Sequence, residues 1–520
     1  MGKPDPWPIP PERLERGLRL GVIEGAFAYA TFTLTSGAVL AAFVYSSGMG
    51  AFQYGLFTAL PFLAQLLQFP NVALLRRWPD RKAMTILYAS IGRLSLLGVS
   101  ASLLLLPPEA RGLGILLSFS LWSIFSALAG GSWLWWMRDL VPKERLGRYF
   151  GNRGAALVAA SAPVLLGAGF FLDWVRGGGE ASIRYAFAAL FATAACFGMV
   201  SSAILAKMPH PPPADDPKSV PFRDSLVVPF RDPNYRRLLV WLGVWWFATT
   251  MTVPFVAVFL FADLGLSVSL VTLLLLVGLG ATVVFLQLWG RLSDRFGNKP
   301  VLRVSVPVLA AALILCSLLP TAPVPLNYAL IVVIQVLLAL SAAGADLTAW
   351  NLSFKLSRGP QAPAFLASTS LVRALATGIG PLVGGSVALL LRGTSILVVA
   401  PVGSGGGVVL LNITRFPLIF LGAAAVVLAS GYVLSRVKEE GEAPRSELLD
   451  ALRLEADDGL VPGVRHFAAA TTVMVQYIVQ MEEKASASLD SGLDALRGAI
   501  DAARGEDDGE EPGPPGPRGT

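Results

Sequence analysis

The sequence contains few charged residues, few cysteines and few histidines, and each shortage excludes a class of protein. Only 15% of its 520 residues are charged, whereas soluble globular proteins carry about 25%. Cys196 and Cys316 lie within apolar segments and are too few for a disulfide framework. With only two histidines, His210 and His466, the chain also lacks the ligands of a typical zinc site. We therefore expect neither a disulfide-stabilised secreted domain nor a metalloprotein.

Sequence motifs for ATP-driven or enzymatic chemistry are missing as well. There is no GxxxxGK[ST] loop for nucleotide phosphates and no HExxH motif. We therefore expect no cofactor and no enzymatic activity. The formal net charge is +6. An excess of basic residues is typical of the loops of a membrane protein, so it does not indicate nucleic acid binding.

Long apolar segments are what the sequence has in abundance. Hydrophobic residues make up 54% of the chain, and about 20 of them in succession cross a bilayer as a helix. Twelve segments reach this length and predict an all-α membrane protein embedded in the lipid bilayer. Their predicted limits are 20–46, 51–75, 83–106, 112–137, 148–174, 184–206, 238–262, 265–289, 299–319, 326–352, 364–391 and 416–436.

The distribution of positive charge predicts the orientation of these spans. Residues 1–19 are polar and proline-rich and do not resemble a signal peptide, so we expect the first span to be retained. Lys and Arg are concentrated in this segment and in every second loop after it. Such an excess marks the cytoplasmic side. We expect both termini to be cytoplasmic, in a multi-pass protein of a prokaryotic inner membrane.

Three landmarks recur along the chain and predict two similar halves. The basic pair at 81–82 matches Asn298 and Lys299, Trp136 matches Trp350, and Pro163 matches Pro381, at separations of 214 to 218 residues. Internal repeats of this length are common in transporters. The predicted divisions are a cytoplasmic N-terminal segment (1–19), two six-helix halves (20–206 and 238–437) joined by a cytoplasmic linker (207–237), and a tail (438–520).

The tail is hydrophilic, and we expect it to be cytoplasmic. Its leucines between 489 and 500 have helical spacing and predict an amphipathic helix. This helix has two candidate partners, the membrane body and a second copy of the chain. The last fifteen residues have the composition of a disordered segment.

One short segment is more specific than the apolar pattern. Residues 290–299 read GRLSDRFGNK, which resembles the signature loop of the major facilitator superfamily. The resemblance implies the two-half fold of that family. It also implies that Gly290, Asp294, Arg295 and Gly297 form a gate that latches the cytoplasmic side in one conformation. We call residues 290–299 the gating loop.

Other segments also resemble the family. Residues 138–153, RDLVPKERLGRYFGNR, are similar to its segment between helices 4 and 5, and residues 378–385, GIGPLVGG, are similar to a pattern that its antiporters carry in helix 5. In this chain the fuller copy of that antiporter pattern lies in the eleventh span and not in the fifth. The loop at 73–82, ALLRRWPDRK, keeps the basic residues of the signature but lacks its glycine and its aligned aspartate.

Ionisable residues within membrane spans are costly and usually functional. Four are candidates for a substrate or ion pathway. Arg93 and Arg373 lie roughly 15 Å and 13 Å into their spans, at 1.5 Å per residue. Asp346, about 9 Å from the cytoplasmic surface, is a candidate proton or cation carrier. Glu24 lies near the start of the first span, where its carboxylate has the alternative of reaching the interface. For the others, the alternative is a structural ion pair.

Tryptophans in the seventh span have two interpretations. Trp245 and Trp246 lie one turn deeper than the tryptophans close to the inner boundary and belong, on one interpretation, to an aromatic box for substrate. The alternative is an interfacial belt, which explains most tryptophans of this chain.

These observations favour a secondary transporter that moves a small-molecule substrate by alternating access, with proton coupling through Asp346 as one interpretation. The alternative is a transporter-like scaffold or receptor that moves no solute.

Overall fold

The computed structural model describes residues 9–78, 80–142, 145–211, 222–319, 324–357, 362–402, 406–444, 446–448 and 450. The predicted helix at 489–500 lies outside these residues. The fold is almost entirely helical, as predicted. Its N-terminal half contains α1 (Pro11–Leu34), α2 (Gly37–Ser46), α3 (Ala51–Ala64), the 3-10 turn η1 (Gln65–Leu67), α4 (Gln68–Arg77), α5 (Arg81–Leu105), α6 (Pro108–Leu140), α7 (Leu146–Arg176) and α8 (Gly179–Lys207).

A short linker helix, α9 (Phe222–Arg231), precedes the C-terminal half. That half contains α10 (Pro233–Ala262), α11 (Val268–Phe296), α12 (Asn298–Leu318), α13 (Val324–Leu356), α14 (Ala362–Leu390), strands β1 (Ile396–Val402) and β2 (Gly406–Ile413), and α15 (Arg415–Ser435). Helix α9 was not predicted, because the linker sequence is polar. The two strands pair in antiparallel fashion as a hairpin.

Eleven helical segments of the described chain are long and apolar enough to cross a membrane. Eleven of the twelve predicted spans correspond to them. The first comprises α1 and α2, which are separated by a break at residues 35 and 36. Gly37, with φ of +55°, begins the second part of this span, a conformation that favours glycine.

The remaining predicted span, 51–75, is the interrupted segment α3–η1–α4. Pro70 lacks an N–H group, and its ring clashes with the carbonyl of residue 66 in a regular α-helix. The turn changes to 3-10 geometry at η1, just before this proline. The amide of Asn71 donates to Ser132 Oγ of α6 at 3.2 Å. Polar contacts and proline therefore explain why this span is not one apolar helix.

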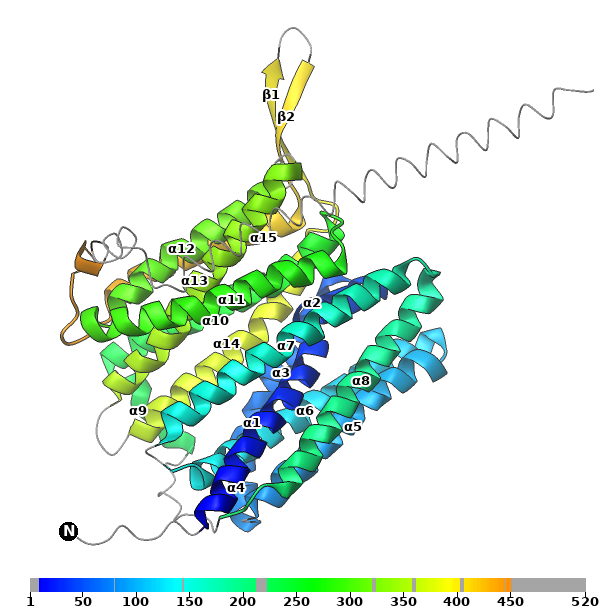
Figure 1. Cartoon of the computed structure of the whole chain (residues 1–520). Helices are drawn as coiled ribbons and strands as arrows, with labels where there is room; N and C mark the ends of the chain where they lie inside the picture. Colours follow the sequence, from blue (N-terminus) through cyan, green and yellow to red (C-terminus); the bar gives the residue numbers. More distant parts are fainter. Residues whose placement is uncertain are drawn as a thin grey trace, which may run out of the picture.

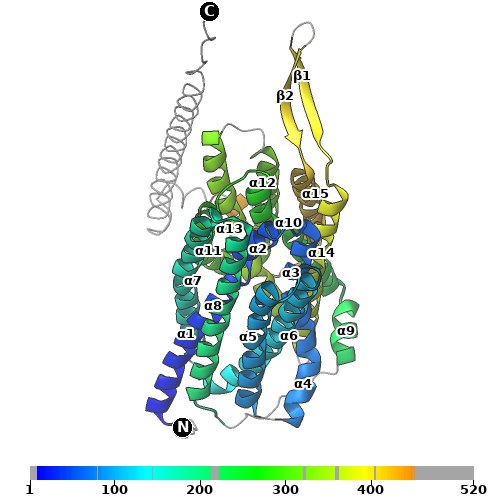
Figure 2. The same ribbon diagram turned by 90° about the vertical axis from the view of Figure 1, so that its right-hand side faces the viewer.

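The helices form two bundles that lie side by side (Figures 1 and 2). Within the first, α5 packs on α6 and α8, and α1 packs on α7 and α8. Within the second, α12 packs on α13 and α15, and α10 packs on α14 and α15. Contacts between the halves involve chiefly α3 with α14 and α7 with α11.

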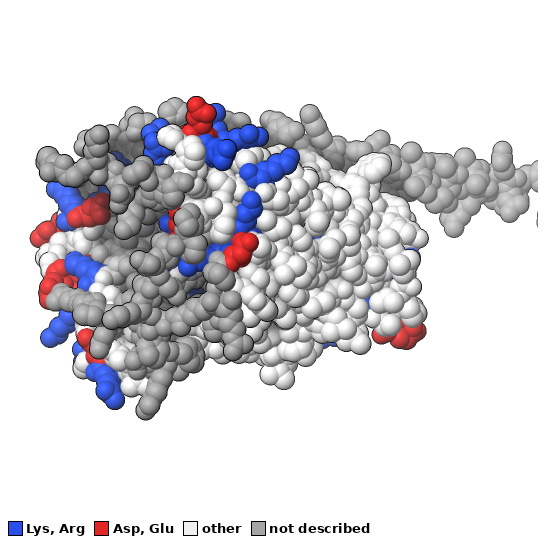
Figure 3. All heavy atoms as spheres, turned by 90° about the horizontal axis from the view of Figure 1, so that it is seen from below, with Lys and Arg blue, Asp and Glu red and all other residues white. Residues whose placement is uncertain are grey.

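Charged side chains gather at one end of the molecule, and Figure 3 shows a broad uncharged surface beyond them. Exposed arginines at this end come from the starts of α1 and α7 and the end of α11: Arg13, Arg19, Arg148, Arg291 and Arg295. We call it the basic end. Many large apolar side chains on the remaining surface are exposed, including Leu105, Trp174 and Leu390. The chain is therefore an integral multi-pass membrane protein.

The halves are in tight contact toward the other end, which carries the β-hairpin (Figure 2). We call this the far end. The Tyr54 hydroxyl of α3 donates to the carbonyl of Pro254 in α10 at 2.9 Å. A Cβ atom at Gly385 of α14 would lie 2.7 Å from the carbonyl oxygen of Ala51, and one at Gly55 would collide with the carbonyl of Pro381. Glycines therefore let α3 and α14 meet backbone to backbone.

Candidate functional site

Glu24 lies deep in the N-terminal half. The sequence analysis placed it near the start of its span, but α1 begins at Pro11. Thirteen residues therefore separate Glu24 from the helix start, which is roughly 20 Å. The residue is only 3% exposed. The alternative of reaching the interface is thus excluded, because the carboxylate is buried among other helices.

Two arginines and one serine surround the Glu24 carboxylate. Arg153 of α7 donates from Nη2 to Glu24 Oε2 at 3.1 Å. The Ser201 hydroxyl of α8 donates to Glu24 Oε1 at 2.7 Å. Arg93 Nη2 of α5 lies 3.9 Å from the same oxygen. Four helices therefore bring one negative and two positive side chains together.

Arg93 is fixed against α8. Its two terminal nitrogens donate to the hydroxyls of Ser202 at 2.6 Å and Ser201 at 2.8 Å. A Cβ atom at Gly198 would collide with the stem of Arg93, so this glycine makes room for the arginine. The predicted depth of Arg93 within its span agrees with its position thirteen residues along α5.

Arg153 was not among the predicted site residues. Its Nε donates to the carbonyl of Gly21 at 3.2 Å, and its guanidinium carbon lies 4.4 Å from the ring centre of Trp133. A Cβ atom at Gly25 would lie 2.8 Å from the guanidinium. Arg153 was interpreted as the end of the motif at 138–153 between two spans, although it lies within the predicted span 148–174 and within α7, which begins at Leu146. The signal that was available is an arginine directly before a long apolar segment.

A cavity of about 260 Å³ opens beside this cluster. Its walls come from α1, α5, α6, α7 and α8. Glu24, Arg93 and Arg153 line one part, and the aromatic residues Phe32, Trp122 and Trp133 line another. Ser126 and Gly130, one helical turn apart on α6, are exposed within its lining. We call this the N-half cavity.

The C-terminal half holds a second pair of opposite charges. Asp346 of α13 is exposed, and the groups that act on its carboxyl are Arg373 of α14 and the indole N–H of Trp246 of α10. Among the described residues, Arg373 forms no direct ion pair with it, and the indole N–H of Trp246 acts on the carboxyl as a hydrogen-bond donor. Because α13 continues to Leu356, Asp346 lies roughly 15 Å from the helix end rather than the predicted 9 Å.

Aromatic rings surround Arg373. Its guanidinium carbon lies 5.4 Å from the ring centre of Trp246 and 5.8 Å from that of Trp350. Trp245, the other predicted tryptophan, is buried and stacks on Trp241 at 5.5 Å. The structure thus places Trp246 with the two charged side chains and Trp245 in the packed interior of its bundle.

The two halves repeat one arrangement. Arg153 of α7 lies over Trp133 of α6, and Arg373 of α14 lies near Trp350 of α13. Helices α7 and α14 also carry the matched prolines Pro163 and Pro381. Each half therefore combines an arginine of its fifth membrane helix with a tryptophan of its fourth.

The gating loop is mostly helical. Helix α11 continues through Phe296 and α12 begins at Asn298, so the predicted loop is reduced to Gly297, whose φ is +90°. Asp294 and Arg295 are exposed at the basic end. Asp294 forms neither an ion pair nor a cap among the described residues. A Cβ atom at Gly290 would meet nothing within 4 Å, so no close helix contact occurs there in this conformation.

Glu439, just beyond α15, caps α12 in place of Asp294. It accepts hydrogen bonds from the N–H of Lys299 at 2.7 Å, from Asn298 Nδ2 at 2.9 Å and from Lys355 Nζ at 2.9 Å. Its burial alone would raise the pKa of this carboxyl, but these donors outweigh burial and lower the pKa. The sequence analysis missed this residue because it lies in hydrophilic sequence.

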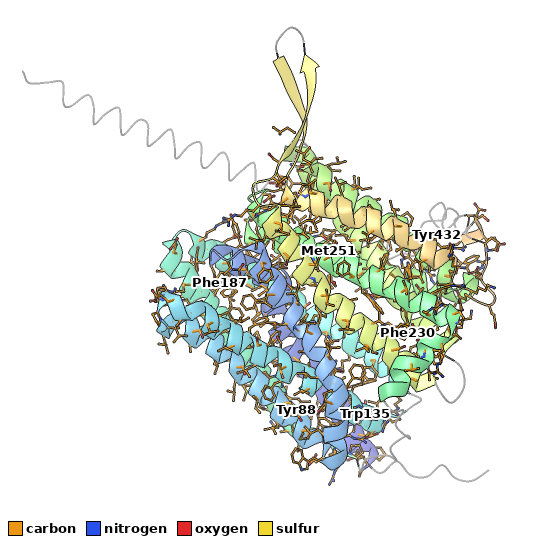
Figure 4. All side chains as sticks on the ribbon, turned by 180° about the vertical axis from the view of Figure 1, so that it is seen from behind. Tyr88, Trp135, Phe187, Phe230, Met251 and Tyr432 are labelled. Carbon is orange, nitrogen blue, oxygen red and sulfur yellow. The ribbon has the colours of Figure 1, made fainter. Side chains whose placement is uncertain are left out.

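The matching junction of the N-terminal half is held differently. Asp80 caps α5 by accepting from the N–H of Ala83 at 2.9 Å. Arg81 pairs with Asp139 at the end of α6, and the Arg138 guanidinium lies 4.4 Å from the ring centre of Trp135. Figure 4 shows Trp135 close to one end of the N-terminal half and Phe187 toward the other.

A model of the family described as the Major Facilitator Superfamily matches residues 23–381 and 246–481. This match covers both halves and most of the chain. The chain belongs to the Major Facilitator Superfamily.

Solved structures of the superfamily have the same fold. A mutant form of the nucleoside transporter NupG gives a TM-score of 0.60 at 14% identity, covering 82% of this chain and 100% of that one. The xylose transporter XylE from E. coli, in an inward-open conformation, gives 0.57 at 13% identity, covering 84% and 99%. A bacterial homolog of the human lysosomal transporter Spinster gives 0.55 at 17% identity, covering 87% and 100%. Comparison with curated proteins gives no match.

Membership of the superfamily confirms the predicted fold and its transporter class. The superfamily fold places the Glu24 cluster and the Asp346–Arg373 pair in separate halves, within helices that span the membrane. These neighbours differ in their named substrates, so the shared fold does not assign one to this member of the superfamily.

Proposed function

We propose that this protein is a secondary transporter that moves a small solute by alternating access, and that the structure represents its inward-open state. The proposal rests on one observation. Contacts between the halves lie toward the far end, whereas the gating loop at the basic end has Asp294 and Arg295 exposed. The basic end is the cytoplasmic side on this account, because positive residues favour that side. Both termini are then cytoplasmic, in a prokaryotic inner membrane.

The reverse state exchanges these contacts. The α3–α14 contact at Gly55 and Gly385 opens, and the ends of the two halves approach at the basic end. Asp294 and Arg295 are then close to the basic and acidic residues at the start of α7 and the end of α6. A charge-assisted bond formed only in that state stabilises it over the present one.

Asp346 is the proposed carrier of a coupling proton. It lies in the middle of a membrane helix, its side chain is exposed, and Arg373 acts on it without a direct ion pair. A carboxylate that alternates between such an open position and a contact with an arginine takes up and releases a proton at different stages of a cycle.

Reconstituted vesicles test this function. The protein is placed in liposomes that contain a pH-sensitive dye, and sugars, amino acids, nucleosides and organic anions are added outside in turn. We expect one solute class to move and to carry protons with it. Asp346→Asn abolishes proton movement but retains solute exchange, and Asp294→Asn slows both. Glu12→Gln, an exposed change at the start of α1, serves as the control.

The alternative function is a scaffold or receptor that moves no solute. If correctly folded protein moves none of these solutes, and Asp294→Asn leaves its conformational distribution unchanged, the transport proposal is wrong and the scaffold is favoured.

A further inference from the structure

We infer that the N-half cavity binds a small organic anion with a flat apolar part, which gives the proposed transporter a substrate class. The inference rests on the proposed transport function for its role, but the binding itself follows from the cavity.

The charge balance of the cavity is the first argument. Its lining contains two arginines and one glutamate as its only charged residues. Their side chains are largely enclosed, at 12% exposure for Arg93, 15% for Arg153 and 4% for Glu24. One positive charge therefore remains without a partner in a site of low dielectric. An enclosed charge is costly unless it is paired, so a monovalent anion is the ligand that completes the cluster.

The hydrogen-bonding capacity of the arginines is the second argument. A guanidinium has five N–H donors. Arg93 uses two of its nitrogens for Ser201 and Ser202, and Arg153 uses two for Glu24 and the Gly21 carbonyl. Donors on both arginines are therefore left for a ligand, and a carboxylate accepts such donors in pairs.

The apolar wall of the cavity is the third argument. Trp122 and Trp133 lie on one side of α6 together with Ser126 and Gly130, at helical spacing. The indole nitrogen of Trp133 is buried and has no acceptor within the described chain. Phe32 of α1 is 44% exposed and also lines the cavity. A flat ring fits between such side chains, whereas a strongly hydrated ion such as phosphate gains nothing from them.

Gly130 provides a way to fill the cavity without changing its charge. A Cβ atom at this position would meet no atom within 4 Å, so a larger side chain extends into the open space. Gly422 of α15 is also free of neighbours within 4 Å and lies in the other half. Gly130→Leu and Gly422→Leu are therefore a matched pair, the first blocking the cavity and the second leaving it open.

A binding titration with the purified full-length protein tests the inference. The probes are benzoate, its neutral isostere benzamide, the cation benzylammonium, and inorganic phosphate. We expect benzoate to bind and to raise the melting temperature by mass action, with no effect of the other three. Arg93→Met and Gly130→Leu each weaken benzoate binding at least tenfold, as expected for a lost charge-assisted contact or a filled site. Gly422→Leu leaves the affinity unchanged.

Two results would overturn the inference. One is equal binding of benzoate and benzamide, since charge would then play no part. The other is benzoate affinity that survives Gly130→Leu in a variant that melts as the wild type does. Benzoate binding without uptake of any tested solute into vesicles contradicts the transport proposal but not the cavity, whereas uptake of another solute that is insensitive to Gly130→Leu contradicts only the cavity.

Discussion

A buried carboxylate within a membrane helix is costly unless donors and opposite charges surround it, and Glu24 has both. Arg153 and Ser201 bind its two oxygens, and Arg93 lies 3.9 Å from one of them. Each arginine has a further anchor of its own, so the cluster is a network that fixes α1, α5, α7 and α8 relative to one another. Removing one member leaves the charges of the others enclosed and less well compensated.

Replacing Glu24 with Gln should therefore lower the stability of the N-terminal half. The amide keeps one acceptor but loses the charge, and we expect a cost of about 1–3 kcal/mol. Thermal unfolding in detergent measures it as a lower melting temperature.

Glu15→Gln is the control for that change. Glu15 is in the same helix and pairs with Arg19 and Arg145, but half of its side chain is exposed. Such surface pairs contribute less than about 1 kcal/mol. Equal losses of stability for Glu15→Gln and Glu24→Gln would contradict the importance of the buried network.

At the scale of elements, the chain after α15, from residue 436 on, crosses the basic end of the C-terminal half and holds helix ends together. We call this segment the strap. The carboxylate of Glu439 is fully buried and joins the start of α12 to Lys355 of α13. Asn234 of α10 exchanges two hydrogen bonds with the backbone of Lys438. The N–H of Ala443 donates to the carbonyl of Phe296 in α11. Four helix ends are thus held by one short segment.

The strap makes stability depend on pH through Glu439. Because its pKa is lowered in the folded protein, its contribution is present above the unfolded value of about 4.5 and is lost as the pH falls through the lower folded value. We expect Glu439→Gln to cost about 1–3 kcal/mol of stability at neutral pH. We also expect the melting temperature of this variant to fall less steeply than that of the wild type as the pH is lowered. Glu447→Gln, an exposed change in the same segment, should alter neither. If the melting temperature of Glu439→Gln fell with acid as steeply as that of the wild type, this account would be contradicted.

The elements also show what the sequence could and could not predict. Apolar length predicted the helices, and positive charge predicted the distinct basic end, because both are set by composition over many residues. The interruption of the second span was missed, although Pro70 and Gln68 were visible, because average hydropathy hides single polar residues. Glu24 was placed too near the end of its span because helices extend beyond their apolar cores. Arg153 was missed because it was interpreted as part of a motif between two spans. Glu439 depends on a contact between distant segments, which no local pattern reveals.

At the scale of the whole molecule, we propose that the two halves rock against each other during alternating access. The halves meet backbone to backbone where Gly55 faces Pro381 and Gly385 faces Ala51. Toward the basic end, by contrast, the described residues show no such contact. On the proposed mechanism, the two bundles adopt a second arrangement in which they are in contact at the other end.

Gly55→Ala tests this coupling without a known substrate. The added methyl group collides with the Pro381 carbonyl and should separate α3 from α14 at the far end. Gly422→Ala, where a Cβ atom meets nothing within 4 Å, is the control and should behave as the wild type.

The most direct measurement is a pair of spin-label distances in the same variants, with Cys196 and Cys316 first replaced by Ser and Ala. One pair, Tyr45→Cys with Arg392→Cys, reports on the far end, and the other, Arg148→Cys with Phe354→Cys, reports on the basic end. Alternating access predicts that Gly55→Ala lengthens the first distance and shortens the second. A longer distance at the far end with no change at the basic end would contradict it.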